Sequence, residues 1–493
     1  MGVIIVLLCI AGIIFFYFYN NPLKHGRWFM IRRFINWFPL GMTYAFLYMG
    51  RYNLNVSKNA LGNLMTKEDF GLIFAAGTVT YAVSFLINGP LVDKIGGKAG
   101  IIIAAVGASL ANILLGVLTY LVVTGQLHMK MVVAFSFLYS LNMYFQSYGA
   151  VSIIKVKAYW FHVRERGVFG ALFGTLISIG VYFAFDWGQE IVDITKINTT
   201  GAESWLGHLL KSIFALETGS IDPTWVVFFV PAIILLFWAL LDWFMIKDTP
   251  EEANFPPFDT ADASSGHMDE KFSAMDLLKK VFGSPLMLTF AFIELTSGVL
   301  RNGVYQWYTI FAKDIKQPGA EFFSEHWGLL LMIFGIIGGF SGGLLSDNHF
   351  QSRRAPPVVF SSAIMFILLL IMAIFLTSSP IIVASAAVLI SGAVIAVHSL
   401  MSGTAAADFG GRKATATSSG ILDGFVYLGT GIQSFSLGYL TTWNWHYWPI
   451  FLMPFALIGM ILAMKIYKEL PEATRKYIAE VEDVAVTVET IPS

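Results

Sequence analysis

The stretch YAFLYMGRYNLNV, residues 44–56, places an arginine inside a run of apolar and aromatic residues. An arginine at the centre of a membrane-spanning helix costs about 2.5–3.5 kcal/mol on insertion scales. Such a residue should face a bundle interior or an aqueous cavity, and it should have a partner there. What holds Arg51 is therefore the question from which the fold and the function can be argued.

The composition around this stretch is that of a membrane protein. Of the 493 residues, 56% are hydrophobic and only 13% are charged, whereas a soluble domain has about 25% charged residues. Because backbone amides in hydrocarbon must be paired within their own segment, apolar runs of about 20 residues are expected to be helices. Thirteen such runs lie at 2–19, 36–57, 68–92, 100–124, 131–154, 168–187, 224–246, 285–311, 326–346, 357–377, 380–402, 414–440 and 446–467.

Charged residues and cysteine exclude several functions. The formal net charge of −1 says nothing about partners by itself, and we predict no nucleic-acid partner. The single cysteine, Cys9, excludes disulfides and thiolate metal sites. The sequence Gly339–Gly343 fits G-x-S-x-G, but it lies in an apolar helical run and lacks the strand–turn–helix context of a nucleophile. We predict no enzyme activity, no metal and no cofactor.

Lysine and arginine in short loops orient the helices, because such residues favour the cytoplasmic side. They gather in alternate loops at Lys24, Arg27, Arg32, Arg33, Lys94, Lys98, Lys157, Arg164, Arg166, Arg353, Arg354, Arg412 and Lys413. We therefore predict a multi-pass protein of the plasma (inner) membrane, surrounded by the lipid bilayer, with a cytoplasmic C-terminus. The first run has no signal-peptide features, which indicates an extra anchor helix. The alternative is a start assigned too early, with Met30 as the true start.

The runs predict five segments. These are an N-terminal anchor helix (1–20), a first six-helix half (30–246), a cytoplasmic linker (247–284), a second six-helix half (285–468) and an acidic cytoplasmic tail (469–493). Three features recur at nearly one offset between the halves: Arg51 with Arg301, Asp93 with Asp347, and Arg166 with Arg412. Internal repeats of this kind are typical of secondary transporters, whose substrate site lies between the halves.

The stretch GPLVDKIGGK, residues 89–98, follows the second helix of the first half. Glycines at 89 and 96 permit close helix approach and a tight turn, and Asp93 can pair with a base or cap a helix. In the second half Asp347 occupies the matching place. The stretch, through Gly89, Asp93, Lys94, Gly96 and Lys98, resembles the cytoplasmic gate motif of the major facilitator superfamily. The resemblance implies an all-α membrane fold of two six-helix halves.

Within that superfamily the chain resembles the organophosphate:phosphate antiporters, over residues ~30–470. The residues that carry this resemblance are Tyr44, Tyr48, Arg51, Asn53, Asn142, Phe145, Gln146, Gly149, Arg166, Gly167, Leu300, Arg301, Gly303 and Trp307. The resemblance implies that Arg51 and Arg301 bind substrate phosphate, with Tyr44, Tyr48 and Gln146 beside them. It also implies a monomer that exchanges an organophosphate for inorganic phosphate. The family's second-helix lysine is absent from Ser84–Leu86, and its fifth-helix Asn and His fall at Gly174 and Ile177.

Helix geometry supports the same pairing without the resemblance. Arg51 and Arg301 lie ~15 and ~16 residues into their predicted helices, so both should be ~22–24 Å from the cytoplasmic start. Two guanidiniums at one depth in one cavity would accept a phosphate or a carboxylate. The alternative is that each arginine is paired internally, with Glu294 or Asp423.

Four further polar residues in apolar runs are candidates. Lys155 is a possible third cation of the cavity, or an interfacial lysine. Glu294 is a counter-ion or a proton relay. His398 and Asp423 are candidates for coupling, or for hydrogen bonds between helices.

These observations predict a secondary transporter of a phosphorylated organic anion that works by alternating access. Two other functions stay open. One is proton- or sodium-coupled symport of an organic carboxylate, and the other is membrane sensing of sugar phosphates by a transporter-like receptor.

Overall fold

Long helices run from one end of the molecule to the other in the computed structural model of this chain. It describes residues 2–162, 165–196, 204–216, 221–258, 260, 279, 282–316, 318–350, 353–405 and 415–469, among which there is no β-strand. The helices of the N-half, a name used here for α2 to α9, follow a separate first helix, α1. The elements up to the linker are α1 (Gly2–Tyr19), α2 (Arg27–Leu61), η1 (Gly62–Leu64), α3 (Lys67–Ile95), α4 (Gly97–Val123), α5 (Met131–Trp160), α6 (Arg166–Tyr182), η3 (Phe183–Trp187), α7 (Gly188–Thr195), α8 (Trp205–Ile213), α9 (Val226–Met245) and η4 (Glu251–Ala253).

The C-half comprises the elements from α11 to α19. They are α11 (Pro285–Tyr305), α12 (Trp307–Ile315), α13 (Glu321–Glu325), α14 (Trp327–His349), α15 (Ala355–Phe375), α16 (Pro380–His398), η5 (Ser399–Ala405), α18 (Thr415–Trp443) and α19 (Tyr447–Lys465). Among the described residues all thirteen apolar runs are helical, one of them, 285–311, as two consecutive helices. The predictions for the tail beyond Glu469, for most of the linker after Phe258, and for Arg412 and Lys413 concern residues outside the described part of the chain.

Two predicted boundaries were wrong for identifiable reasons. α2 begins at Arg27 rather than at 36, because Arg33 is buried and paired within the protein instead of lying in a solvated loop. The run 285–311 is not one helix, since α11 ends at Tyr305 and α12 begins at Trp307.

The long helices differ in how apolar they are. Within the part of the chain that the structure describes, eight helices are long and apolar enough to cross a membrane: α1, α3, α4, α9, α14, α15, α16 and α19. The helices α2, α5, α11 and α18 fall below that limit although they are long enough to span a bilayer. Their polar side chains are buried in the bundle. A buried binding site for a polar ligand would therefore lie among these four helices.

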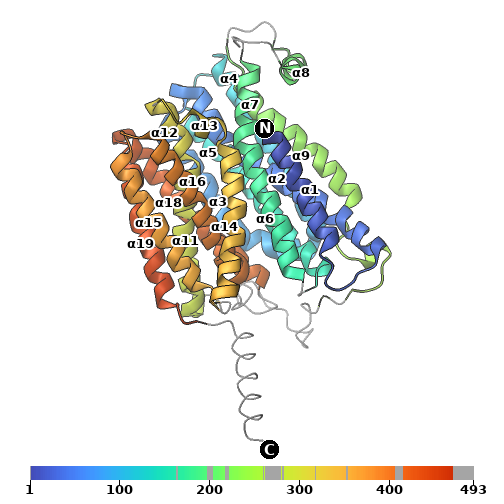
Figure 1. Ribbon diagram of the computed structural model, residues 1–493. Coiled ribbons are helices and arrows are strands. Elements are labelled where there is room, and N and C mark those ends of the chain that lie inside the picture. Colours follow the sequence, from blue (N-terminus) through green and yellow to red (C-terminus); the bar gives the residue numbers. More distant parts are fainter. Residues whose placement is uncertain are drawn as a thin grey trace, which may run out of the picture.

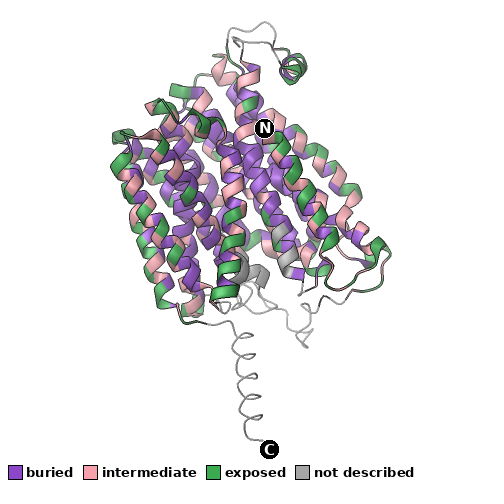
Figure 2. Ribbon diagram, viewed as in Figure 1, coloured by how far each residue is buried: buried purple, intermediate pink, exposed green. Residues whose placement is uncertain are grey.

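The two halves meet along two helix pairs. α3 of the N-half packs along α18, and α6 packs along α14; the second pair lies at the centre of Figure 1. Buried residues concentrate where the halves meet, and exposed ones follow the outer faces of helices such as α15 and α19 (Figure 2). We call the end that carries α7, α8 and α13 the loop end. The opposite end, which carries residues 247–258, is the linker end.

The first helix belongs to the packed structure. α1 lies against α6, and Tyr17, with none of its side chain exposed, donates a hydrogen bond to the carbonyl oxygen of Met30 at 2.8 Å. The outer face of α1 is apolar and exposed, as expected of a helix with one side in lipid. The predicted extra N-terminal helix is thereby supported.

A buried ion pair fixes this helix to the linker end. The guanidinium of Arg33 donates to both carboxylate oxygens of Glu165, at 2.8 and 2.9 Å, and to the hydroxyl of Tyr17 at 3.0 Å. Both charged side chains are 1% exposed, and His25 Nε2 lies 3.2 Å from Glu165. Burial opposes ionisation of Glu165, but the His25 and Arg33 contacts outweigh it and lower the pKa of Glu165 to about 2.

We expect Glu165→Gln to lower the free energy of unfolding by about 3–5 kcal/mol at neutral pH, because it leaves the charge of Arg33 buried and unpaired. The folded pKa of Glu165 is depressed, so its stabilisation is complete above the unfolded value near 4.3 and is lost as pH falls toward 2. Melting temperatures in detergent should therefore differ most between wild type and variant above pH ~5 and converge in acid. A constant difference would contradict this assignment.

The stretch 89–98, which resembles the gate motif, contacts the start of the linker. Gly96 has a φ of +89°, a conformation that favours glycine, and a Cβ there would lie 2.2 Å from Asp248 Oδ2. The Lys98 amide donates to Asp248 at 2.8 Å, so this turn binds the start of the linker. The predicted close approach at Gly89 is wrong, because nothing lies within 4 Å of a Cβ at that position. Lys94 is exposed.

The two motif aspartates behave alike. Asp93 pairs with Lys155 at 3.0 Å within the N-half, and Asp347 pairs with Arg354 at 2.6 Å within the C-half. Both carboxylates are more than half exposed, and exposed pairs contribute little stability. The contacts described for these aspartates therefore order each half separately.

Candidate functional site

Arg51 lies at the centre of the bundle with 1% of its surface exposed. Its Nε donates to Gln146 Oε1 on α5 at 2.9 Å, and its Nη1 donates to the hydroxyl of Tyr427 on α18. The guanidinium also lies over the rings of Tyr48 and Tyr81, each 4.7 Å from the ring centroid. These partners are neutral, so the positive charge of Arg51 is hydrogen-bonded without being neutralised.

The backbone at this point of α2 is held by buried polar side chains. Asn112 on α4 and Asn142 on α5 both donate to the carbonyl oxygen of Gly50, at 3.2 and 2.9 Å. Tyr139 donates to the carbonyl oxygen of Arg51 at 3.1 Å. The predicted family residue Asn142 therefore orients the helix that carries the arginine.

Arg301 comes from the other half and contacts Tyr427, which also contacts Arg51. We call the two arginines with Tyr48, Tyr81 and Tyr427 the arginine cluster. It is 7% exposed, its guanidinium carbon lies 5.9 Å from the ring centroid of Tyr427, and its Nε has no hydrogen-bond partner within the described part of the chain. Among the described residues neither Arg51 nor Arg301 forms an ion pair. The alternative that Glu294 or Asp423 neutralises the arginines is thus not what the described contacts show.

Tyrosines fill the space between the two arginines. Tyr427 contacts both guanidiniums and packs on Tyr81 with ring centroids 4.1 Å apart. Sequence reasoning missed both residues, although a tyrosine within an otherwise apolar helix run was a usable signal. The predicted residues Tyr44 and Tyr48 pack edge to face 5.6 Å apart and are 7% and 8% exposed.

The remaining predicted site residues separate into two places. Lys155, near the end of α5, forms an ion pair with Asp93 and does not contact Arg51. Glu294 is fully buried and contacts His398 rather than Arg301, with Oε2 3.1 Å from His398 Nδ1. Asp423 accepts a hydrogen bond from Ser402 Oγ.

On the loop-end side of the arginine cluster, the two halves are hydrogen-bonded to each other. Tyr52 donates to Asn302 Oδ1 at 2.8 Å, one residue on from each arginine, and Asn55 donates to Thr309 at 3.1 Å. At the loop end Lys67 pairs with Asp314 at 3.0 Å. Because each bond joins N-half to C-half, the loop end is closed in this structure.

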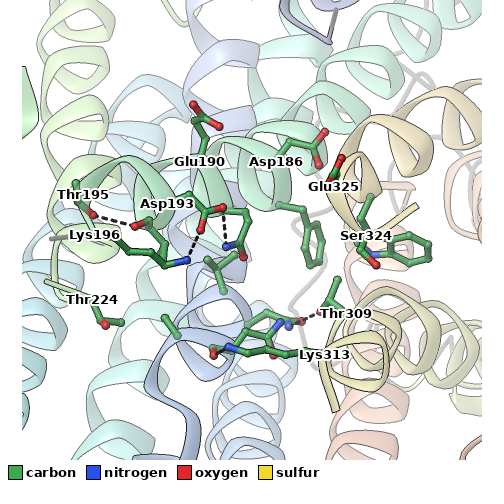
Figure 3. Close-up of a pocket in the computed structure, with 18 of the residues that line it drawn as sticks. Asp186, Glu190, Asp193, Thr195, Lys196, Thr224, Thr309, Lys313, Ser324 and Glu325 are labelled. Atoms are coloured by element: carbon green, nitrogen blue, oxygen red, sulfur yellow. Dashed lines mark hydrogen bonds and ion pairs between the residues drawn. The ribbon is translucent and has the colours of Figure 1, made fainter. Parts of the chain in front are cut away.

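A cavity of about 910 Å³ lies outside this closure (Figure 3). It is lined from both halves, by residues that include Asn55, Asp186, Asp193, Lys196, Thr309, Lys313 and Glu325. The two arginines are not part of its lining. It is therefore a vestibule of the loop end, separated from the arginine cluster by the Tyr52–Asn302 layer.

Asp186 links the two halves at the edge of the vestibule. It lies in the π-helix η3 of the N-half and accepts hydrogen bonds from the amides of Gly328 at 2.6 Å and Leu329 at 3.1 Å. These amides are in the first turn of α14, where backbone N–H groups have no helical acceptor and where the helix dipole favours an anion. The carboxylate thus caps a helix of the opposite half.

We expect Asp186→Ala to shift the protein toward a state open at the loop end by about 10- to 100-fold, because charge-assisted hydrogen bonds contribute about 1.5–3 kcal/mol each before compensation. The measurement is the thiol labelling rate of Val56→Cys, a buried vestibule position, in a Cys9→Ser background. Asp193→Ala is the matched control, since Asp193 lines the same vestibule but pairs with Lys196 of its own half. Equal labelling rates would show that Asp186 does not hold the closure.

Comparison with known proteins assigns this fold to a family of membrane transporters. The family model for the Major Facilitator Superfamily matches residues 40–434. The chain belongs to the Major Facilitator Superfamily, and it is a multi-pass membrane protein and not an enzyme.

Three relatives are named for transport of a phosphorylated compound or for membrane sensing. A Chlamydia trachomatis protein named 'Probable hexose phosphate transport protein' is 24% identical over 477 residues, covering 92% of this chain and 94% of the relative. The membrane sensor protein UhpC of Escherichia coli is 22% identical, with coverage of 86% and 91%. The glycerol-3-phosphate transporter of Bacillus subtilis is 23% identical over 59% of each chain.

Solved structures agree on the fold. The inward-facing, unoccupied crystal structure of a bacterial homologue of the human lysosomal transporter Spinster superposes with a TM-score of 0.68, at 14% identity, over 92% of this chain and 99% of that one. The Escherichia coli fucose:proton symporter has a TM-score of 0.52 at 16% identity, over 87% and 98%.

Proposed function

We propose that this protein transports a phosphorylated organic anion, a sugar phosphate or a glycerol phosphate, in exchange for inorganic phosphate. The observation that carries the proposal is the pair of buried guanidiniums, Arg51 and Arg301, which come from different halves and share one tyrosine, Tyr427. Relatives named for hexose phosphate and glycerol-3-phosphate transport support the choice of phosphate over other anions.

The geometry suits a phosphate in chemical terms. A guanidinium presents a planar set of donors that matches two oxygens of a phosphate. Arg301 has its Nε free of protein partners in the described part, and Arg51 has only neutral ones. An anion bound between the two arginines would give each guanidinium a negatively charged partner in place of a neutral one. In a buried site the attraction between opposite charges is strong, so binding of the anion is favourable.

Transport would follow from contacts between the halves. An anion bound by one arginine from each half stabilises the state in which the halves are closest, and it can drive the cycle only by that difference in affinity. The closed loop end and its hydrogen bonds describe one state of that cycle. Its counterpart would break those bonds and open the vestibule to the cluster. In this proposal the loop end is external, the C-terminus is cytoplasmic, the membrane is the inner membrane and the protein works as a monomer.

Two other functions use the same cluster. A proton- or sodium-coupled carboxylate symporter would present its arginines to a carboxylate. A sensor would bind a sugar phosphate with little flux, and the relation to UhpC gives this reading its support.

The test is uptake of labelled phosphate into proteoliposomes loaded with unlabelled phosphate. We expect exchange that unlabelled sugar phosphates or glycerol 3-phosphate inhibit and that citrate or succinate does not. Phosphate binding without exchange, measured as protection against heat, would favour the sensor. Carboxylate uptake without phosphate exchange would favour the symporter.

A further inference from the structure

A second polar group in the C-half has no role in anion binding as described above. Glu294 has no exposed surface, and its Oε1 has no hydrogen-bond partner within the described residues. Its Oε2 contacts His398 Nδ1 at 3.1 Å. The His398 side chain is 26% exposed, so it connects the buried carboxyl of Glu294 with the surface of the protein.

The local fold brings these groups together from three helices. α16 ends at His398, and the π-helical segment η5 follows at once. π-Helical turns inside α-helices are frequent at functional sites. From η5, Ser402 donates to Asp423 on α18, and Asp423 is partly exposed. Glu294 on α11 is the third member, so α11, α16 and α18 each contribute one titratable side chain.

The charged neighbours of Glu294 are few. They are His398, Asp423 and Arg301, and Arg301 lies two turns further along the same helix, at about 10.5 Å of axial rise. Of the other elements packed on α11, α19 has only Tyr447 and Lys465 as titratable groups, one at each end, and α18 adds Tyr427 and Tyr439. Lys313 and Asp314 of α12 lie at the loop end, and the η5 segment 399–405 has none.

We propose that Glu294 and His398 form a proton-binding site, and that a proton held there is coupled to the anion between Arg51 and Arg301. Burying an ionised carboxylate with one oxygen unpaired is costly. A proton on the pair removes that cost. His398 can pass the proton to Glu294 through their hydrogen bond, with no other group consumed or released.

The coupling follows from charge. With Glu294 ionised and His398 neutral, the negative charge offsets part of the field of Arg301. Protonation of the Glu294–His398 pair removes this negative charge, so Arg301 attracts an anion more strongly. By linkage the anion must then raise the affinity for the proton by the same factor. This inference rests on the proposed function, since phosphate is the anion used to test it.

The experiment measures phosphate exchange and its KM in proteoliposomes, at equal internal and external pH, between pH 5.5 and 8.5. Phosphate itself titrates in this range, but it does so equally for every variant. In wild type we expect the KM to rise with pH more steeply than in Glu294→Gln, which is permanently neutral, by up to tenfold per pH unit. Proton uptake on phosphate binding, followed with a pH dye in detergent, should be smaller in the variant.

Asp242→Asn is the matched control. Asp242 on α9 is also fully buried, with Oδ2 accepting from Thr43 at 2.6 Å and Oδ1 free within the described part, but no charged group contacts it there. We expect its pH profile to follow wild type. Should Glu294→Gln fold poorly, His398→Gln removes the other half of the site and gives the same test.

The outcomes separate this inference from the proposed function. Exchange with identical pH profiles in wild type and Glu294→Gln overturns the proton site alone. A folded Glu294→Gln protein that phosphate no longer protects against heat at any pH also overturns it, because Glu294 would then serve anion binding directly. Wild-type protein that exchanges no phosphate at any pH overturns both.

Discussion

Replacing Arg301 by lysine should reduce phosphate exchange by about 30-fold or more while leaving the melting temperature near that of wild type. Lysine keeps the charge but loses the planar fork. Truncating one partner of a buried, hydrogen-bonded charge pair costs about 2–5 kcal/mol, which corresponds to about 30- to several thousand-fold. Arg301 forms no side-chain hydrogen bond among the described residues, so the folded protein loses little with it.

Arg51→Lys should differ in a diagnostic way. It should lose exchange to the same extent and also lower the melting temperature, because Arg51 donates to Gln146 and to Tyr427. Arg32→Lys is the control on the same helix, since Arg32 contacts a backbone carbonyl at the linker end. Exchange that survives in Arg301→Lys would mean that this arginine does not hold the phosphate, and the clamp would have to be abandoned.

The second large effect should come from a glycine. Gly71 lies where α3 crosses α18, and a Cβ there would be 2.4 Å from the carbonyl oxygen of Ser434 and 2.9 Å from Gly438 Cα. Both are backbone atoms of the opposite half, so the helices themselves would have to separate. We expect Gly71→Leu to keep the loop end from closing and to abolish exchange, although phosphate still binds.

The measurement combines two readouts on one preparation. Labelled phosphate exchange should fall below detection, and protection of the purified protein by phosphate against heat should remain. Gly170→Leu is the control, because a Cβ at Gly170 meets nothing within 4 Å. Normal exchange by Gly71→Leu would show that the closure at this crossing is not a step of the cycle.

The long apolar helices and the membrane environment were readable from the sequence, whereas the short helices α7, α8, α12 and α13 were not predicted. Hydrocarbon imposes helices on apolar runs of sufficient length, and the thirteen predicted runs are helices in the described structure. The repeat of Arg51 by Arg301 was readable for a related reason, since charge inside an apolar run is rare enough to stand out. Because α2 begins at Arg27 and not at 36, the equal depth predicted for the two arginines rested on a wrong helix start, yet both guanidiniums lie near the ring of Tyr427.

Only the tertiary structure decided which polar groups meet. Lys155, Glu294 and His398 were each visible in the sequence, but their partners are 62 residues away for Lys155 and 104 residues away for the other two. Helix periodicity fixes which residues share a face of one helix. It does not fix which neighbouring helix that face meets.

The sequence by itself therefore determined the class of protein, the two related halves and the two arginines, because each depends on composition or on a repeat along one chain. The structure decided that tyrosines surround those arginines, that Asp186 caps a helix of the other half, and that Glu294 lies on His398. These contacts depend on how helices from distant parts of the chain pack side by side.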